Sequence, residues 1–291
     1  MRSSARPATW AAEDATIGPI DPLAWLSAPC VMGVLNITPD SFSDGGEFLD
    51  PVAALRRLGA IARDGAVICD VGAESTRPGA MPVSSDEQLR RLEPVLNAMS
   101  AGCDIAISID TASAAVARAA LDAGAVLVND ITAGRGDPGL LPLVAEHGAA
   151  VCLVHMQGEP RTMQEAPRYQ DVTGDVAAFL GERLAAAVAA GIPETNVLLD
   201  PGIGFGKRLD DNLTLLRELP RLAVLGRPLV IGVSRKSMFG QLLGREVGER
   251  MAGSLAAGLM ALDRGAAVLR VHDIRETADA IAVWQAVRGV G

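Results

Sequence analysis

Carboxylates and amides follow several short apolar runs of the sequence, where they could bind a polar ligand. Asp110, Asn129 and Asp200 each stand at the end of such a run. Because a carboxylate accepts two parallel N–H bonds, this set suits a planar heterocycle with guanidine-like N–H edges. Helix capping is the simpler interpretation of any one of these aspartates. For the three run ends together, ligand recognition is the better interpretation.

Cationic side chains follow the last two apolar runs and indicate a site for an anion. Lys236 and Ser237 come after the seventh run, and Arg270 and His272 end the eighth. Arg270 and His272 are two residues apart on an expected strand, so both point to the same face. Phosphate groups are often bound after the seventh and eighth strands of (β/α)8 barrels, which favours a phosphate site here.

Two further polar segments follow the first and second apolar runs. In the first, Asn36, Asp40 and Asp44 offer oxygen atoms without nitrogen or sulfur partners, which suits Mg²⁺ unless the segment is simply a solvated loop. In the second, Thr76 and Arg77 lie near glycines and could bind an oxyanion, although a turn with one surface arginine is equally consistent. Both segments are expected to be loops.

Other polar or aromatic residues stand apart from these sets. Phe205 is flanked by glycines after the sixth run and is expected at a loop surface rather than in the core. That segment has neither P-loop nor dinucleotide-binding spacing. His155 ends the fifth run, where a structural and a catalytic role are both consistent. Lys207 and Lys236, the two lysines of the chain, both follow apolar runs.

Strands and helices are expected in strict alternation, because eight apolar runs alternate with eight segments of helical periodicity. Continuous apolar runs fit strands buried on both faces, as in a parallel sheet with right-handed crossovers. Eight such units in 291 residues fit a closed α/β fold, the (β/α)8 TIM barrel, better than an open doubly wound sheet. The runs are residues 31–36, 66–70, 105–110, 126–130, 151–155, 197–200, 229–236 and 268–272.

Composition limits the domain organisation and the class of partner. A hydrophobic content of 49% and a charged content of 21% are typical of a globular protein, here one barrel over residues 30–291 after a loosely ordered arm, 1–29. The net charge of −9 argues against a nucleic-acid or membrane partner. A secretory or membrane-spanning apolar segment is not found, and four scattered cysteines fit a reducing compartment, so a cytoplasmic location is expected.

Eight segments at these positions resemble the dihydropteroate synthases of folate biosynthesis. They keep the family's order and span roughly residues 31–285. The departures are Ala73, where the family usually has glycine, and a longer N-terminal arm, and neither touches a matched ligand residue. The matching segments are residues 32–46, 70–79, 108–111, 129–131, 155–158, 200–207, 234–237 and 270–273.

The resemblance implies a (β/α)8 transferase with Mg²⁺ as cofactor. The family joins 6-hydroxymethyl-7,8-dihydropterin diphosphate to p-aminobenzoate, releasing pyrophosphate and giving 7,8-dihydropteroate. It also implies a homodimer, for which the small-residue helix 253–262 is a candidate interface unless it is buried against the barrel. The metal would be held by Asn36 and Asp44, with Asp70 as support behind the ligand residues.

The resemblance also assigns the substrate contacts. The pterin ring would be held by Asp110, Asn129, Asp200 and Lys236. The diphosphate would be bound by Arg270 and His272, with help from Thr76 and Arg77. The p-aminobenzoate pocket would be lined by Thr76, Pro78, Phe205, Ser237 and Phe42.

A dissociative substitution without a covalent enzyme intermediate is the mechanism that follows. Arg270 and His272 would neutralise the departing pyrophosphate, Asp110 would stabilise positive charge on the pterin, and Lys236 completes the catalytic set. One alternative is a methyltetrahydrofolate:corrinoid methyltransferase, in which the cationic run ends would have no diphosphate to bind. The other is a non-catalytic pterin-binding paralogue, against which the intact first segment argues.

Overall fold

Eight parallel strands form a closed barrel in which each strand pairs with the next and β8 pairs with β1. The computed structural model describes residues 21–37, 51–75, 80–159 and 161–289. The predicted (β/α)8 barrel is confirmed, and the open sheet is wrong. The strands are β1 (Cys30–Asn36), β2 (Ile68–Gly72), β3 (Ala106–Asp110), β4 (Leu127–Asp130), β5 (Ala150–Val154), β6 (Val197–Asp200), β7 (Leu229–Ile231) and β8 (Ala266–Val271).

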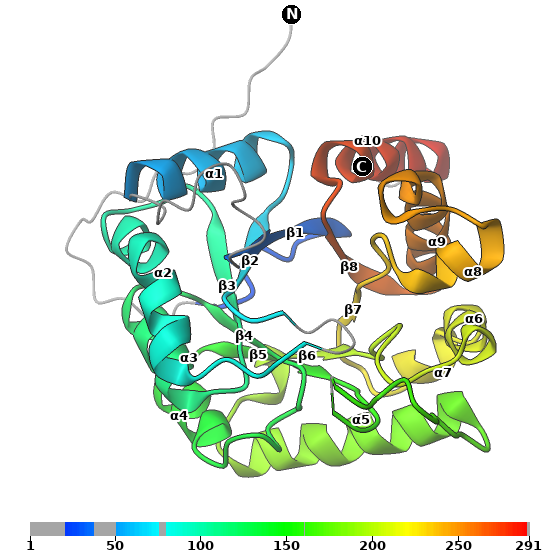
Figure 1. Ribbon diagram of the computed structural model, residues 1–291, viewed down its shortest axis with the longest axis horizontal. Coiled ribbons are helices and arrows are strands. Elements are labelled where there is room, and N and C mark those ends of the chain that lie inside the picture. The colour runs from blue at the N-terminus through cyan, green and yellow to red at the C-terminus, as the bar shows by residue number, and fades with distance from the viewer. Residues whose placement is uncertain (1–20, 38–50, 76–79, 160, 290–291) are drawn as a thin grey trace, which may run out of the picture.

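Helices surround the barrel, and each segment of helical periodicity contains one (Figure 1). Two short helices that the periodicity did not predict are α7 (Pro220–Ala223) and α8 (Ser237–Leu243). Both are too short for an apolar repeat to be detected. The others are α1 (Pro51–Arg63), α2 (Ser85–Ser100), α3 (Ala114–Asp122), α4 (Leu140–Glu146), α5 (Val172–Ala189), α6 (Leu209–Arg217), α9 (Met251–Asp263) and α10 (Ile274–Arg288), with 3-10 turns η2 (Glu194–Asn196) and η3 (Val247–Glu249).

Side-chain caps explain where several helices begin. The Ser84 side chain accepts a hydrogen bond from the backbone N–H of Glu87 at the start of α2. The Glu87 carboxylate binds Arg90 and Arg91, so only the Ser84 half of a capping box is formed. Asp171 likewise caps α5 by accepting from the N–H of Gly174.

The lumen of the barrel is apolar towards the amino ends of the strands and polar towards their carboxyl ends. Alternate residues of each strand point inward, so one strand supplies both kinds of side chain. The apolar part consists of Met32, Ile68, Leu127, Ala150, Cys152, Val154, Leu198, Val230 and Val268. A second, larger core lies between the strands and the helices. The change from apolar to polar side chains along the lumen positions the candidate site at the carboxyl end.

The segment just before β1 packs against the lumen. Leu23, Trp25 and Leu26 contact the apolar lumen cluster, and the Trp25 indole donates a hydrogen bond to the carbonyl of Pro22. Part of the expected loose arm, residues 22–26, is therefore packed on the barrel, while residues 1–20 lie outside the described residues. An apolar lumen open to water at this end would expose its side chains, and this segment covers them.

The small residues of α9 face the barrel. Ala257, Gly258 and Ala261 are buried, and a Cβ at Gly258 would lie 3.0 Å from Leu269 on β8. Burial against the barrel, one of the two interpretations, therefore accounts for the small-residue pattern.

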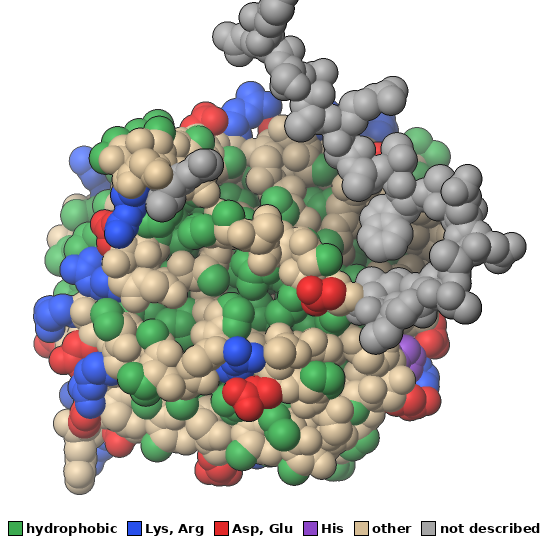
Figure 2. Space-filling model, turned by 180° about the vertical axis from the view of Figure 1, so that it is seen from behind, with side chains coloured by type: hydrophobic (Ala, Val, Ile, Leu, Met, Phe, Trp, Pro, Cys, Tyr) green, Lys and Arg blue, Asp and Glu red, His purple; other side chains and the backbone are tan. Residues whose placement is uncertain are grey.

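The surface of the described part mixes charges of both signs. On the face shown in Figure 2, Lys and Arg side chains lie among Asp and Glu side chains. Within the described ranges, none of the helices has the length and apolar character needed to cross a membrane.

Candidate active site

Six polar side chains gather in the lumen at the carboxyl ends of five strands. Strand register brings them level, because Asp70 pairs with Ser108 and Asp110 pairs with Asn129 in the parallel ladder. The set comprises Asp70, Ser108, Asp110, Asn129, Asp200 and Arg270. Residues spread over two thirds of the chain thus meet at one end of the barrel, as the positions of the run ends predicted.

Asp70 is the centre of this network and is completely buried. Its carboxylate accepts hydrogen bonds from Ser108 Oγ at 2.6 Å, from Asn129 Nδ2 at 3.0 Å and from Arg270 Nε at 2.6 Å. A buried carboxylate is costly unless it is paired and hydrogen-bonded, and here it is both. Asp70, expected only as support, therefore joins β2, β3, β4 and β8.

Arg270 lies between two carboxylates. Its Nε donates to Asp70, and its Nη2 donates to Oδ2 of Asp110 at 2.7 Å. Burial raises the pKa of Asp110, and the charge of Arg270 offsets this only in part. The Arg270 side chain keeps 21% of its surface exposed, so the guanidinium closes the network and still reaches the open end of the lumen.

Asn129 and Asp200 present acceptors that their neighbours do not use up. Asn129 Nδ2 is bound to Asp70, while its Oδ1 is buried and has no partner among the described residues. Asp200 accepts from the backbone N–H of Gly202 at 2.7 Å, and burial raises the pKa of its carboxyl. A buried acceptor without a donor is unfavourable, so these atoms mark where a ligand N–H group would bind.

Lys236 and Phe205 form the side of the site near β6 and β7. The Lys236 ammonium lies 4.3 Å from the centroid of the Phe205 ring, a cation–π contact. Burial lowers the pKa of Lys236 to about 8, although the charge of Asp200 opposes this shift. Arg235 has a positive φ of 57°, and its guanidinium pairs with Asp273, which fixes the backbone that carries Lys236.

His272 and Ser237 lie at the rim. His272 is exposed after β8, and its Nδ1 lies 3.1 Å from Ser234 Oγ, which also accepts from the His272 backbone N–H. Ser237 is exposed at the first position of α8. Both are therefore placed to meet a ligand that projects from the lumen.

Several predicted residues cannot be placed. Phe42 and Asp44, with Thr76, Arg77 and Pro78, lie outside the described residues. Asn36 is described at the end of β1, in register with Gly72, and its side chain forms no hydrogen bond with a described residue. Metal ligation by Asn36 and Asp44 thus stays a prediction.

A second buried polar cluster lies beside the site and was not predicted as a cluster. Lys207 and His155, 52 residues apart in sequence, are in contact through Nζ and Nδ1 at 2.8 Å. The sequence did offer a signal, because Lys207 is one of only two lysines in the chain. Their contact depends on how the segments after β5 and β6 pack, which residue spacing does not determine.

Comparisons with known proteins agree with this geometry. The family described as "Pterin binding enzyme" matches residues 32–272. A dihydropteroate synthase of Escherichia coli is 47% identical over 261 residues, covering 90% of this chain and 92% of that protein.

Solved structures are similar over the same extent. The Yersinia pestis dihydropteroate synthase in a sulfonamide drug complex is 45% identical, with a TM-score of 0.85 over 91% of this chain and 96% of that one. The Xanthomonas albilineans enzyme with 4-aminobenzoic acid is 48% identical, with a TM-score of 0.85 over 91% and 95% of the two chains. The chain described here belongs to the dihydropteroate synthase family of pterin-binding enzymes and is a transferase.

Proposed function

We propose that the carboxyl end of the lumen binds a pterin diphosphate and transfers its pterinylmethyl group to p-aminobenzoate, releasing pyrophosphate. Membership of the dihydropteroate synthase family supports this reaction, and a Xanthomonas albilineans relative, 45% identical, was solved with 7,8-dihydropteroate. The observation that carries the assignment to this site is the row of buried acceptors at Asp110, Asn129 and Asp200.

The pterin ring binds against the buried acceptors. Asn129 Oδ1 and the Asp200 carboxylate accept hydrogen bonds from the ring N–H and amino groups, whose donors lie in one plane. Lys236 donates from the opposite side, next to Phe205. Asp110 lies close enough to the ring to stabilise the positive charge that develops as the pterinylmethyl carbon loses its leaving group.

The diphosphate lies towards Arg270 and His272. Within the described part, no acceptor binds Arg270 Nη1, so this group can donate to a phosphate oxygen while Nε and Nη2 hold Asp70 and Asp110. His272 is exposed at the rim and can donate to a second phosphate oxygen. Thr76 and Arg77, which lie outside the described residues, would complete this side of the proposed site.

We propose that a Mg²⁺ ion binds beside the diphosphate, with Asn36 as the ligand that the described part supplies. Magnesium is usually held by one or two protein oxygens together with substrate phosphates and water. Asn36, with a side-chain oxygen that no described residue uses, supplies one such ligand, and Asp44 would supply the second. Clusters of three or more His, Cys, Asp or Glu side chains suited to a metal are not found among the described residues. The bound ion would withdraw charge from the leaving pyrophosphate.

The p-aminobenzoate ring lies at the rim beside Phe205. Phe205 and Ser237 border this region in the described part. We propose that Thr76, Pro78 and Phe42, which lie outside the described residues, would complete it. An aryl amine is a weak nucleophile, so departure of pyrophosphate must run ahead of attack. Because Arg270 and His272 stabilise the leaving group and Asp110 the pterin cation, we propose a dissociative substitution without a covalent enzyme intermediate.

Pyrophosphate release tests the proposal. The purified chain, given both substrates and Mg²⁺, should release pyrophosphate in amounts equal to the dihydropteroate formed. Asp200→Asn should lower kcat/KM for the pterin diphosphate at least tenfold, because one hydrogen bond to a charged acceptor is worth about 1.5–3 kcal/mol. Asp263→Asn, a change at the end of α9 remote from the lumen, is the matched control. Binding of pterin without turnover would instead indicate a non-catalytic paralogue.

We also propose a cytoplasmic homodimer without nucleic-acid or membrane partners. Support for the dimer comes from exposed apolar side chains at one side of the barrel, on and between α8 and α9, which are Leu242, Leu243, Val247, Met251 and Met260. Light scattering during gel filtration tests it: a mass twice that of the chain is expected, and a single-chain mass at micromolar concentration contradicts it.

A further inference from the structure

We propose that Lys207, acting with His155, is a positioning residue for p-aminobenzoate, because it fixes the loop that carries Phe205. This inference rests on the proposed function. The loop runs from Pro201 to Gly206, between β6 and Lys207. It has no regular hydrogen-bond ladder of its own, so other groups must determine its conformation.

The Lys207 ammonium binds the loop from inside. Its Nζ donates to the carbonyl of Gly202 at 2.9 Å, donates to the carbonyl of Phe205 at 3.0 Å and lies 2.8 Å from His155 Nδ1. An ammonium has three N–H donors, and this arrangement uses all three. Lys207 is only 3% exposed, so its ammonium form depends on these partners rather than on water. Burial lowers the pKa of Lys207 to about 7, although the charge of Asp200 opposes this shift.

His155 is suited to accept from Lys207. It is 5% exposed, and burial, reinforced by the charge of Lys207, lowers its pKa to about 3. The ring is therefore neutral near pH 7, and the neutral ring can present an unprotonated Nδ1. Its ring also packs edge-to-face on Phe179 of α5, with centroids 4.8 Å apart. Packing on the helix thus determines where Lys207 is held.

Backbone packing leaves the loop little freedom. Gly202 and Gly206 both have a positive φ, of 66° and 61°. A Cβ at Gly202 would overlap the carbonyl oxygen of His155, and one at Gly206 would overlap that of Gln157. The loop therefore lies directly against the segment that follows β5, with Lys207 between them.

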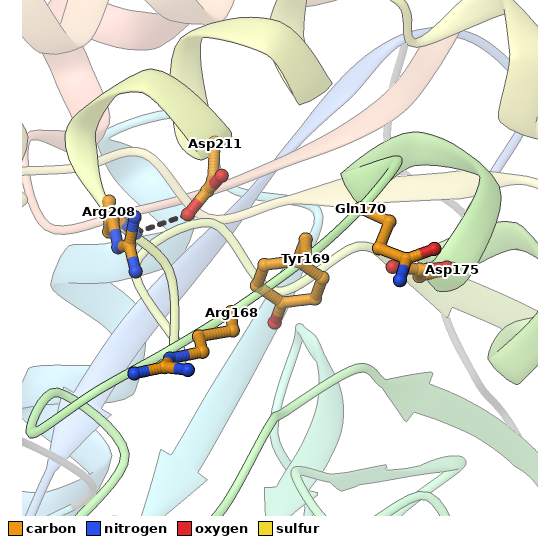
Figure 3. Close-up of a pocket in the computed structure, with 6 residues that line it drawn as sticks. All are labelled: Arg168, Tyr169, Gln170, Asp175, Arg208 and Asp211. Atoms are coloured by element: carbon orange, nitrogen blue, oxygen red, sulfur yellow. Dashed lines mark hydrogen bonds between the residues drawn. The ribbon is translucent and has the colours of Figure 1, made fainter.

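Side chains outside the cluster bind two further carbonyls of the loop. Gln164 Nε2 donates to Gly204 at 2.7 Å, and the Tyr169 hydroxyl donates to Gly206 at 2.8 Å. Tyr169 lies in the middle of a surface pocket of about 520 Å³, between Arg208 and Asp211 on one side and Gln170 and Asp175 on the other (Figure 3). The loop is thus held by two groups, the buried Lys207 ammonium and the half-buried Tyr169 hydroxyl.

These hydrogen bonds determine the position of Phe205. The Lys207 bond to the Phe205 carbonyl fixes the residue whose ring lies 4.3 Å from Lys236 Nζ. Asp200 also touches the loop, because its carboxylate accepts from the backbone N–H of Gly202. It depends on the loop less than Phe205 does, because its own backbone is held in the sheet, where the N–H of His155 donates to the Asp200 carbonyl at 2.9 Å. Loss of Lys207 should therefore disturb the arylamine side of the site more than the pterin side. Lys207 has no free donor for substrate, so it positions and does not act as a catalytic residue.

Steady-state kinetics of Lys207→Met test this. We expect KM for p-aminobenzoate to rise about tenfold, since a preorganised contact surface is lost. KM for the pterin diphosphate should change less than about twofold, because Asp200 and Asn129 stay in the sheet. Leu180→Ala, a change at a buried residue of α5, should lower the melting temperature by loss of core packing without moving either KM.

Two variants of His155 keep the test decisive if Lys207→Met does not fold. His155→Leu removes the acceptor and should raise KM for p-aminobenzoate as Lys207→Met does. His155→Asn places an amide oxygen near the Nδ1 position and should restore KM to within about threefold of the original enzyme. Equal increases in both KM values, or a fall in stability alone, would overturn the positioning role. If the unchanged chain releases no pyrophosphate at all, the proposed function fails instead.

Discussion

Arg270 Nε and Asp70 Oδ2 meet at 2.6 Å although the two residues are 200 positions apart in the chain. Their contact joins β8 to β2 across the lumen, and Arg270 also holds Asp110 of β3. The ion pair lies at the same end of the barrel as the proposed diphosphate site. The same guanidinium therefore closes the polar network and faces the substrate.

Arg270→Ala should lower both stability and turnover. Removing the cation leaves two buried carboxylates unpaired, so the unfolding free energy should fall by about 3–5 kcal/mol. Urea denaturation at pH 7 measures this loss. Arg275→Ala is the matched control, because Arg275 pairs with Asp64 at the surface with 71% of its side chain exposed, and it should cost less than about 1 kcal/mol. Equal losses in the two variants would contradict a structural role for Arg270.

Asn129→Ala should weaken pterin binding selectively. The variant removes the buried Oδ1 acceptor and also leaves Asp70 with one donor fewer. We expect kcat/KM for the pterin diphosphate to fall about tenfold to a hundredfold, equivalent to about 1–3 kcal/mol. KM for p-aminobenzoate, measured at saturating pterin diphosphate, should stay unchanged. A change confined to p-aminobenzoate would show that Asn129 does not bind the pterin.

Activity should fall as the pH rises through about 8, where Lys236 loses its proton. The ammonium is the form that donates to the pterin side of the site, so kcat/KM for the pterin diphosphate should decline on the alkaline side. Lys236→Arg keeps the charge and should shift this decline to higher pH, at a lower maximum rate. If the alkaline limb is unchanged in Lys236→Arg, another group, such as Lys207, is responsible for it.

Lys236 also has a predictable effect on stability. Its pKa in the folded chain, about 8, is below its usual value of 10.5, so the unfolded chain binds more protons between these values. The contribution of Lys236 to the free energy of unfolding should therefore rise with pH across this window. The difference in unfolding free energy between the original chain and Lys236→Met, followed from pH 7 to 10, measures it. A difference that stays constant with pH would contradict the lowered pKa.

Gly202→Ala should be far more damaging than Gly148→Ala. Both glycines have similar positive φ angles, 66° and 62°. A Cβ at Gly148 would meet nothing within 4 Å, whereas one at Gly202 would overlap the His155 carbonyl. Gly148→Ala should cost about 1–2 kcal/mol for its backbone conformation alone. Gly202→Ala should cost clearly more or give no soluble protein, and equal melting temperatures for the two variants would refute the close packing.

Sequence periodicity was sufficient to predict the barrel, because each strand carries its own apolar run and each long helix its own repeat. It was also sufficient to place Asp110, Asn129 and Asp200 at one end, since strand ends of a parallel barrel converge. It could not predict that Asp70 is the centre of the network, because that depends on side chains from three other strands reaching one carboxylate. The Lys207–His155 contact was not predicted for the same reason. Helix α8 was not predicted because an apolar repeat cannot be detected over seven residues.

The closed amino end of the barrel limits the route by which ligands enter and leave the lumen. Trp25 and Leu23 cover the apolar layer that fills the lumen around Met32, Ile68 and Leu198. A molecule bound near Asp110 can therefore arrive and depart only past the carboxyl ends of the strands. Under the proposed reaction, two substrates and two products use this one opening. The compound bound at the rim must therefore leave before the compound bound deeper in the lumen can be replaced.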